Sequence, residues 1–239
     1  MDVTTFKELH HDRAPGDPLI LPGPWDAASA RTFAEAGFPA LATPSAGVAA
    51  SLGYADGETP ADEMFAAVTR IVRAVAVFGT PVSADLESGY GLPPKELVAR
   101  ALDAGVVGVN LEDSTESGLN DPQQHADWLA EVRSAAGDAL FVNGRVDTYV
   151  RGLPDLDETI SRARLYVDAG ADSIYPILAP PDQLRALASA IPAPLNALAL
   201  PDGPSPRELG QLGAARVTFG PGLLRRAMGA VGAIAQELR

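Results

Sequence analysis

The sequence predicts an α/β fold, a (β/α)8 TIM barrel, on three observations. Short apolar runs alternate with longer amphipathic segments from residue 19 to the end of the 239-residue chain. The apolar runs are nearly continuous, which is typical of parallel strands whose outer face is covered by helices. Glycine follows most of the amphipathic segments, as it does where a helix turns back into a strand. Eight such strand–helix units fit this barrel, whose usual size is about 250 residues.

The predicted elements follow one another without a linker or a low-complexity stretch. The strands cover Leu19–Leu21, Ala40–Thr43, Val82–Leu86, Val106–Leu111, Leu140–Asn143, Ser173–Ile177, Leu195–Ala199 and Arg216–Phe219. The helices cover Thr4–His10, Asp26–Ala36, Ala61–Phe78, Lys95–Ala104, Pro122–Ala136, Leu156–Ala169, Pro181–Ala190, Ser205–Leu212 and Pro221–Leu238. The closing glycines are Gly37, Gly79, Gly105, Gly137, Gly170 and Gly213.

We predict one barrel domain over residues 1–239 with a short N-terminal helix. An open doubly wound sheet is the alternative architecture. The count of eight strands favours the barrel, and so does the lack of a glycine-rich dinucleotide fingerprint after the first strand.

Composition limits the function classes. The net charge of −13 disfavours nucleic acid and anionic membrane surfaces as partners. The chain has no cysteine, which excludes disulfides, zinc–thiolate sites and a cysteine nucleophile. It shows no signal-peptide pattern and no apolar run of about 20 residues, so we expect a cytoplasmic protein without a membrane span.

The stretch from Pro81 to Gly91 carries the most informative pair of acids. Asp85 and Glu87 stand two residues apart at the end of a predicted strand, where side chains at this spacing point to the same face. Two carboxylates that share one small volume repel each other and are costly to desolvate. A cation or a proton resolves this conflict, and a solvated strand end is the plainer alternative.

Other polar side chains follow the remaining strands, and the active site of such a barrel lies at the carboxyl ends of its strands. They are Trp25, Asp26, Ser45, Tyr54, Asp56, Glu112, Asp113, Asn143, Arg145, Asp147, Tyr175 and Asn196. Oxygen ligands of this kind suit Mg²⁺, which keeps several of its waters. Arg145 suits a substrate carboxylate or phosphate, with a rim salt bridge to Asp147 as the alternative. Backbone amides of Ser45, Ala46 and Gly47 suit an anion.

Five motifs resemble the isocitrate lyase / phosphoenolpyruvate mutase superfamily, in the order found there. They are Pro22–Ala30, Ser45–Gly53, Ala84–Gly91, Asn110–Asp113 and Asn143–Asp147, and the resemblance extends from about residue 6 to the C-terminus. The resemblance implies a barrel that binds Mg²⁺ and a small α-oxo or enolpyruvyl acid. It implies cleavage or rearrangement of a C–C or P–C bond through a metal-stabilised enolate. It also implies a homo-oligomer, a dimer or tetramer, in which the last helix is exchanged between subunits.

The resemblance assigns roles residue by residue. Asp85 would bind the metal directly, and Glu87 and Glu112 would hold metal-bound waters. Asp56 would lie near the substrate. Arg145 would bind the substrate carboxylate together with Ser45 and the amides of Ala46 and Gly47, and Trp25 and Asn196 would line the pocket.

The loop from Ser114 to Asp121 departs from the family pattern. It lacks the cysteine and lysine of the lyases, and only residues such as Ser114 and Asn120 echo the mutase and phosphonopyruvate hydrolase branch. We therefore expect a mutase, hydrolase or decarboxylase. The alternatives are an isocitrate- or methylisocitrate-type lyase with an atypical acid/base group, and a non-catalytic protein that binds an oxo acid.

Overall fold

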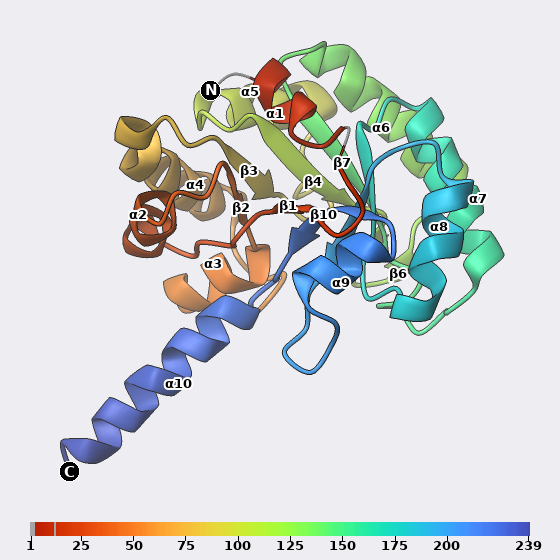
Figure 1. The fold of residues 1–239 in the computed structure, drawn as a ribbon. Helices are drawn as coiled ribbons and strands as arrows, with labels where there is room; N and C mark the ends of the chain where they lie inside the picture. Colours follow the sequence, from red (N-terminus) through yellow and green to blue (C-terminus); the bar gives the residue numbers. More distant parts are fainter. Residues whose placement is uncertain (1–2, 12) are drawn as a thin grey trace.

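Eight parallel strands form one curled sheet in the order β1-β10-β9-β8-β7-β4-β3-β2 (Figure 1). The computed structural model describes residues 3–11 and 13–239, so residues 1, 2 and 12 of the predicted domain lie outside the described residues. The strands are β1 (Leu19–Ile20), β2 (Leu41–Thr43), β3 (Val82–Asp85), β4 (Gly108–Glu112), β7 (Phe141–Val146), β8 (Ser173–Pro176), β9 (Leu195–Leu198) and β10 (Ala214–Thr218). The amide of Ala42 donates to the carbonyl of Pro22, at 3.2 Å, where the two ends of the sheet meet. The predicted barrel fold is confirmed.

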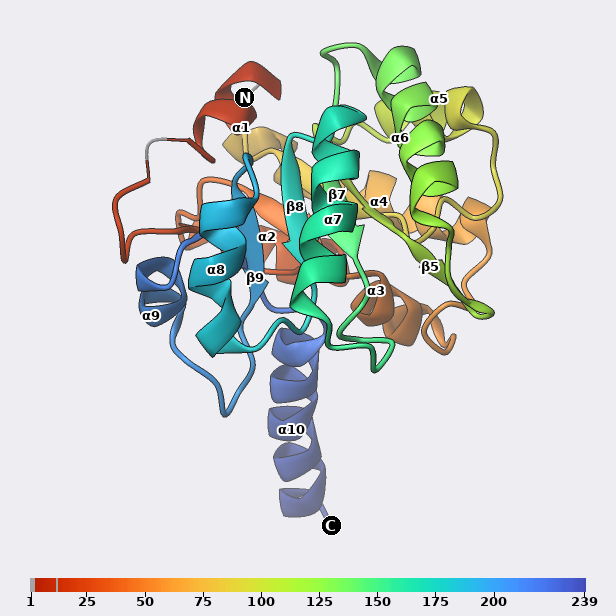
Figure 2. The same ribbon diagram turned by 90° about the vertical axis from the view of Figure 1, so that its right-hand side faces the viewer.

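Helices surround the outside of the sheet (Figures 1 and 2). They are α1 (Val3–Glu8), α2 (Ala27–Glu35), α3 (Ser45–Leu52), α4 (Ala61–Val75), α5 (Pro94–Asp103), α6 (Pro122–Ala136), α7 (Leu156–Asp168), α8 (Leu184–Ala190), α9 (Pro206–Gln211) and α10 (Gly222–Glu237). Short 3-10 turns, η1 (Ala76–Phe78) and η2 (Pro181–Gln183), follow α4 and precede α8. Local sequence starts several of these helices, as at α6, where the Asp121 carboxylate accepts from two backbone amides and Pro122 follows.

The interior of the barrel is apolar at one end and polar above it. Phe6 of α1 packs with Leu19 and Phe141 at the amino ends of the strands. Above them, buried amides bond to one another, as where Asn143 Nδ2 donates to Asn110 Oδ1 at 2.8 Å. Arg216 is 0% exposed in this layer and donates to Asn110 Oδ1 at 3.2 Å. The strands therefore deliver polar side chains up to the carboxyl end.

Two elements differ from the sequence-based expectation. Residues 45–52, expected as a loop, form the helix α3, which ends at Gly53 with a φ of 90°. Residues 114–121, expected as a plain lid, contain the antiparallel hairpin of β5 (Ser114–Thr115) and β6 (Gly118–Leu119). Both elements border the carboxyl end of the barrel, so both bear on the site.

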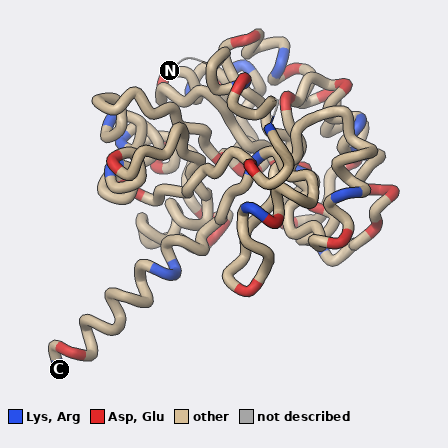
Figure 3. Tube along the Cα trace, viewed as in Figure 1, with Lys and Arg blue, Asp and Glu red and all other residues tan. Residues whose placement is uncertain are grey.

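Helix α10 extends away from the barrel in both ribbon views (Figures 1 and 2). Of its residues only Leu224 is buried. Charged residues are spread over the barrel body, whereas the middle of α10 carries none (Figure 3). Within the described chain, we find no helix with the length and apolar character that a membrane span requires.

Candidate active site

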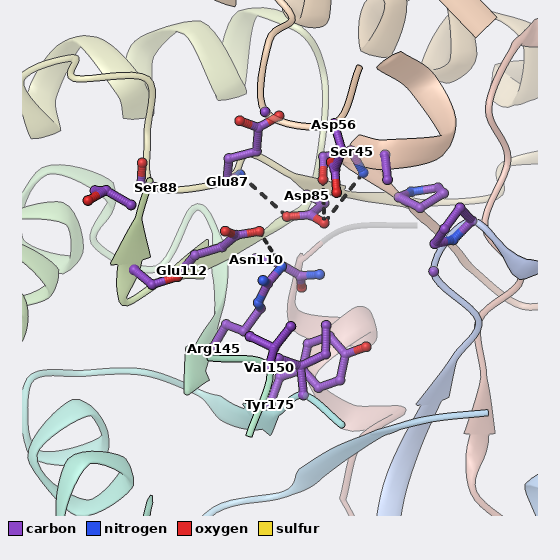
Figure 4. A pocket seen from close by; sticks show the side chains of 18 of the residues that line it. Ser45, Asp56, Asp85, Glu87, Ser88, Asn110, Glu112, Arg145, Val150 and Tyr175 are labelled. Carbon is purple, nitrogen blue, oxygen red and sulfur yellow. Dashed lines mark hydrogen bonds and ion pairs between the residues drawn. The ribbon is translucent and has the colours of Figure 1, made fainter. Parts of the chain in front are cut away.

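A cavity of about 620 Å³ opens at the carboxyl ends of the strands. Strand ends supply Asp85, Glu112, Arg145 and Tyr175 to its wall, and the close view shows these side chains around one space (Figure 4). This is the end at which such barrels place their active sites.

Asp85 is the last residue of β3 and is 9% exposed. Its Oδ2 accepts from the Ser45 hydroxyl at 3.0 Å and from the Ser45 amide at 3.4 Å, and its Oδ1 accepts from the Glu87 amide at 3.4 Å. Burial raises the pKa of Asp85 above its ordinary value, although nearby Arg145 and the Ser45 hydrogen bonds act in the opposite direction. The cost of burial thus exceeds what these hydrogen bonds and Arg145 offset. A cation beside the Asp85 carboxylate would stabilise its charged form.

Glu87 lines the same cavity, but the strand argument for its direction is wrong. Strand β3 ends at Asp85, and Glu87 lies in a turn with a φ of 52°, a conformation that is costly for a residue other than glycine. Its buried Oε1 makes no hydrogen bond of ordinary geometry, although the Tyr90 hydroxyl lies close enough to lower the pKa of Glu87. Burial, followed by repulsion from Asp85 and Asp56, raises the pKa of Glu87 to about 7. The strained backbone at Glu87 therefore holds its carboxylate in the same cavity as that of Asp85.

Arg145 is the centre of an ion-pair network at the end of β7. Its Nη1 pairs with Glu112, and its Nε and Nη2 donate to the two oxygens of Asp147 at 2.6 and 3.1 Å. Burial and the nearby Asp85 raise the pKa of Glu112, although Arg145 lowers it. A guanidinium has five N–H donors, so two remain for a ligand. The salt bridge that the sequence offered as an alternative is present.

Ser114 and Asp56 border the cavity from two loops. The Ser114 hydroxyl donates to Asp147 and accepts from the Arg151 Nε at 3.0 Å. Asp56 lies beyond α3 and is exposed at the cavity mouth (Figure 4). Ser114 is therefore held by two partners, while the Asp56 carboxylate faces solvent and the cavity.

Residues 45–47, whose backbone amides were expected to bind an anion, form the first turn of α3. Ser45 and Ala46 line the cavity, whereas Gly47 is buried outside its lining. The Gly47 amide donates to the carbonyl of Pro44 at 3.1 Å, because the first turn of a helix uses this donor internally. The Gly47 amide is thus engaged within the helix and the Ser45 amide is directed at Asp85, and substrate binding by the Gly47 amide stays a prediction.

Besides Gly47, three further predicted site residues lie outside the cavity lining, namely Trp25, Asn120 and Asn196. The Trp25 ring packs edge-on against Phe33. The backbone of Asn120 bonds to Asp113 and Arg162. Asn196 is 0% exposed, and its Nδ2 donates to Thr218 Oγ1 at 2.9 Å, so it supports the cavity floor from below.

The residues fit a metal ion held through one carboxylate and water. In residues 3–11 and 13–239, no three His, Cys, Asp or Glu side chains are grouped closely enough to form a full ligand set. The Asp85 and Glu87 side chains nevertheless share the cavity. Burial is the largest cause of the raised pKa of each carboxyl group. A divalent cation would relieve this repulsion, and Mg²⁺ commonly binds through one or two carboxylates and several waters.

Sequence reasoning left Thr218 and Arg151 without a role, and offered Tyr90 as a gate residue or as packing over the turn between Gly89 and Gly91; all three line the cavity. The Tyr90 hydroxyl is buried beside the Glu87 carboxylate and makes no hydrogen bond of ordinary geometry. Arg151 lies in the loop after β7, four residues beyond Asp147. Its position in a strand-to-helix loop at the carboxyl end of the barrel was the available signal.

Comparisons with known proteins find similarity over nearly the whole chain. The family model described as phosphoenolpyruvate phosphomutase matches residues 6–239. The 2-methylisocitrate lyase of Bacillus subtilis is 32% identical over 194 residues, which cover 76% of this chain and 62% of the relative.

Two solved structures extend the comparison. A candidate phosphonomutase of Burkholderia cenocepacia J2315 has a TM-score of 0.91 and 40% identity, over 98% of this chain and 99% of that one. An oxaloacetate acetylhydrolase, solved with the inhibitor 3,3-difluorooxalacetate, has a TM-score of 0.88 and 25% identity, over 99% and 86% of the two chains.

Fold, site and motifs together define an enzyme with a barrel active site. The chain belongs to the phosphoenolpyruvate mutase / isocitrate lyase superfamily, a group of lyases and phosphonomutases that act on small molecules and are generally metal-dependent.

Proposed function

We propose that this protein is a Mg²⁺-dependent enzyme acting on a small α-oxo or enolpyruvyl acid, in which it breaks or rearranges the adjacent C–C or P–C bond. The observation that carries the proposal is the meeting of Asp85, Glu87 and Arg145 in one cavity. Acids that repel one another attract a cation, and an arginine beside them attracts a substrate carboxylate. The names of the phosphonomutase and of the oxaloacetate acetylhydrolase support the same substrate class.

Each residue has a defined task in this proposal. Asp85 holds the ion directly, and Glu87 and Glu112 hold it through water. Mg²⁺, when bound, supplies positive charge to the oxygens of the substrate as the bond beside them breaks. The two remaining N–H donors of Arg145 orient the substrate carboxylate, and the Ala46 amide lies in the same wall. Asp56 is placed to exchange protons with solvent at the mouth.

The hairpin of β5 and β6 favours a mutase, hydrolase or decarboxylase over a cysteine-dependent lyase. It contains neither cysteine nor lysine. The Ser114 hydroxyl donates a hydrogen bond to Asp147. We therefore assign Ser114 to orienting the Asp147 side chain and not to protonating the substrate. Asn120, outside the lining, has no catalytic task in this proposal.

A lyase of the 2-methylisocitrate type is the second candidate. The named relative from Bacillus subtilis supports it. Such a lyase would need an acid/base group other than cysteine, and the Tyr90 hydroxyl lines the cavity beside Glu87.

A substrate panel tests the proposal. Purified protein with Mg²⁺ is incubated separately with oxaloacetate, phosphonopyruvate and 2-methylisocitrate, and substrate loss is followed together with the formation of pyruvate, phosphoenolpyruvate and oxalate. We expect turnover of oxaloacetate or phosphonopyruvate that disappears with a chelator and in the Asp85→Asn variant. Turnover of 2-methylisocitrate alone would support the second candidate. Tight oxalate binding without any turnover would identify a binding protein.

We further propose that α10 mediates a homo-oligomer, by packing against a second copy of the chain. Three of its apolar side chains, and that of Leu238 directly after it, are about half or more exposed; the three are Met228, Val231 and Ile234. A row of this kind on a helix that leaves the barrel is costly in water. Light scattering that gives a monomer at micromolar concentration would contradict this proposal.

A further inference from the structure

Arg151 is a cavity-lining cation whose charge the proposed chemistry does not use. It lies in the loop after β7 and borders the cavity together with Ser114 and Thr115 of the hairpin. Its Nε donates to the Ser114 hydroxyl at 3.0 Å, and its Nη2 donates to the Thr115 carbonyl. Within the described residues, no carboxylate oxygen lies within 4.0 Å of its guanidinium. Arg151 therefore keeps its charge unpaired.

The loop that carries Arg151 is fixed by its backbone. The Arg151 amide donates to the carbonyl of Asp147 at 3.0 Å, and the Leu153 amide donates to the carbonyl of Thr148 at 2.8 Å. The side chain is held at its other end by the hairpin. A guanidinium positioned on both sides loses little conformational entropy when a ligand binds.

The charges of the cavity make this arginine significant. Asp56, Asp85, Glu87, Glu112 and Glu116 line the cavity, and only two described arginines oppose them. One of these, Arg145, is already paired with two carboxylates. A substrate with two anionic groups would be repelled over most of the wall. Arg151 offers the second anionic group of such a substrate a positive charge that is not paired with a carboxylate.

A chain of hydrogen bonds fixes the spacing of the two arginines. Arg145 is bonded to Asp147, Asp147 to the Ser114 hydroxyl, and the Ser114 hydroxyl to Arg151. One carboxylate and one hydroxyl thus separate two guanidinium groups along the wall. This arrangement matches a short molecule with an anionic group at each end.

We propose that Arg151, with the neighbouring Thr115 hydroxyl, binds the second anionic group of a dianionic oxo acid whose oxo-acid end lies at Asp85 and Arg145. This inference rests on the proposed function and narrows its substrate class. The second group is a carboxylate or a phosphonate, since both accept the planar fork of an arginine. Arg151 then separates dianionic substrates from pyruvate and other monoanions.

The test compares dissociation constants of the full-length protein with Mg²⁺ by calorimetry. The ligands are pyruvate, with one anionic group, and 3,3-difluorooxaloacetate and phosphonopyruvate, with two. The variants are Arg151→Met, Arg151→Lys and the control Arg185→Met, which removes an exposed arginine from α8. A charge-assisted hydrogen bond lost in Arg151→Met corresponds to about 10- to 100-fold weaker binding of a dianion. We expect pyruvate affinity to change less than about twofold and Arg151→Lys to recover part of the loss.

The outcomes separate this inference from the proposed function. A loss confined to difluorooxaloacetate identifies a carboxylate as the second group, and a loss confined to phosphonopyruvate identifies a phosphonate. Equal weakening of pyruvate and the dianions, or no weakening of either dianion, overturns the inference while the oxo-acid site stands. Failure of the wild-type protein to bind any of the three ligands overturns the proposed function and this inference together.

Discussion

Replacement of Arg145 by methionine tests whether this arginine neutralises the cavity wall. The change removes the ion pair to Glu112 and both hydrogen bonds to Asp147, whose side chain is 0% exposed. Breaking a buried ion pair by removing one partner costs about 3–5 kcal/mol, because a buried charge is left without compensation. One kcal/mol lowers the melting temperature of a chain of this size by about 2–4 °C. We therefore expect Arg145→Met to unfold about 6–20 °C below the wild type.

The assay is thermal unfolding at neutral pH with a chelator present, so that metal binding does not contribute. Arg185→Met serves as the control, because Arg185 is exposed on α8. The double variant Arg145→Met, Glu112→Gln should recover part of the loss, since it removes one of the two orphaned charges. An Arg145→Met protein that melts within about 2 °C of the wild type would show that Arg145 does not neutralise the cavity wall.

Three further predictions concern pH, the turn after β3 and α10. Burial is the main cause that lowers the pKa of His10 from 6.5 to about 3. The stability that neutral His10 contributes is complete above pH 6.5. It is lost at about 1.4 kcal/mol per pH unit as the pH falls from 6.5 to about 3. Urea unfolding at several pH values should show a shallower acid slope for His10→Gln, and an unchanged slope would contradict this. Gly89→Ala should destabilise the fold by about 1–3 kcal/mol more than Gly91→Ala in urea unfolding, because φ is positive at both sites but only the new Cβ at 89 meets another atom, 2.9 Å away in the Trp128 ring. Equal losses would remove the steric argument. Val231→Asp should yield a monomer by light scattering with an unchanged circular dichroism spectrum, and a retained oligomer would exclude this face of α10.

Much of the fold was predictable because its signals are local. Each tight turn from helix to strand needs a left-handed residue, and glycines such as Gly37 and Gly105 supply it with φ values of 86° and 81°. Helix α3 was missed because its residues 45–52 are mostly small and show little amphipathic contrast. The hairpin of β5 and β6 was missed because each of its strands has only two residues.

The candidate site was predictable in its residue types and less so in its geometry. Asp85 and Arg145 come from strand ends, and the barrel brings such residues together. Glu87 reaches the cavity through a left-handed turn, which strand periodicity does not predict. Asn196 was expected in the wall but bonds below it, because its side chain fills the polar interior layer. The role proposed for Arg151 depends on its contact with the hairpin of β5 and β6, which is distant from it in the sequence.

The central claim is that Asp85 anchors a Mg²⁺ ion that in turn holds an oxo acid. Thermal unfolding with oxalate, with and without Mg²⁺, tests it most directly. A ligand at 100 times its dissociation constant adds about 2.7 kcal/mol of stability, which is about 5–11 °C for a chain of this size. The account predicts such a shift for the wild-type protein only when Mg²⁺ and oxalate are both present, and none for a folded Asp85→Asn variant. The same shift without Mg²⁺, or in the Asp85→Asn variant, would contradict it.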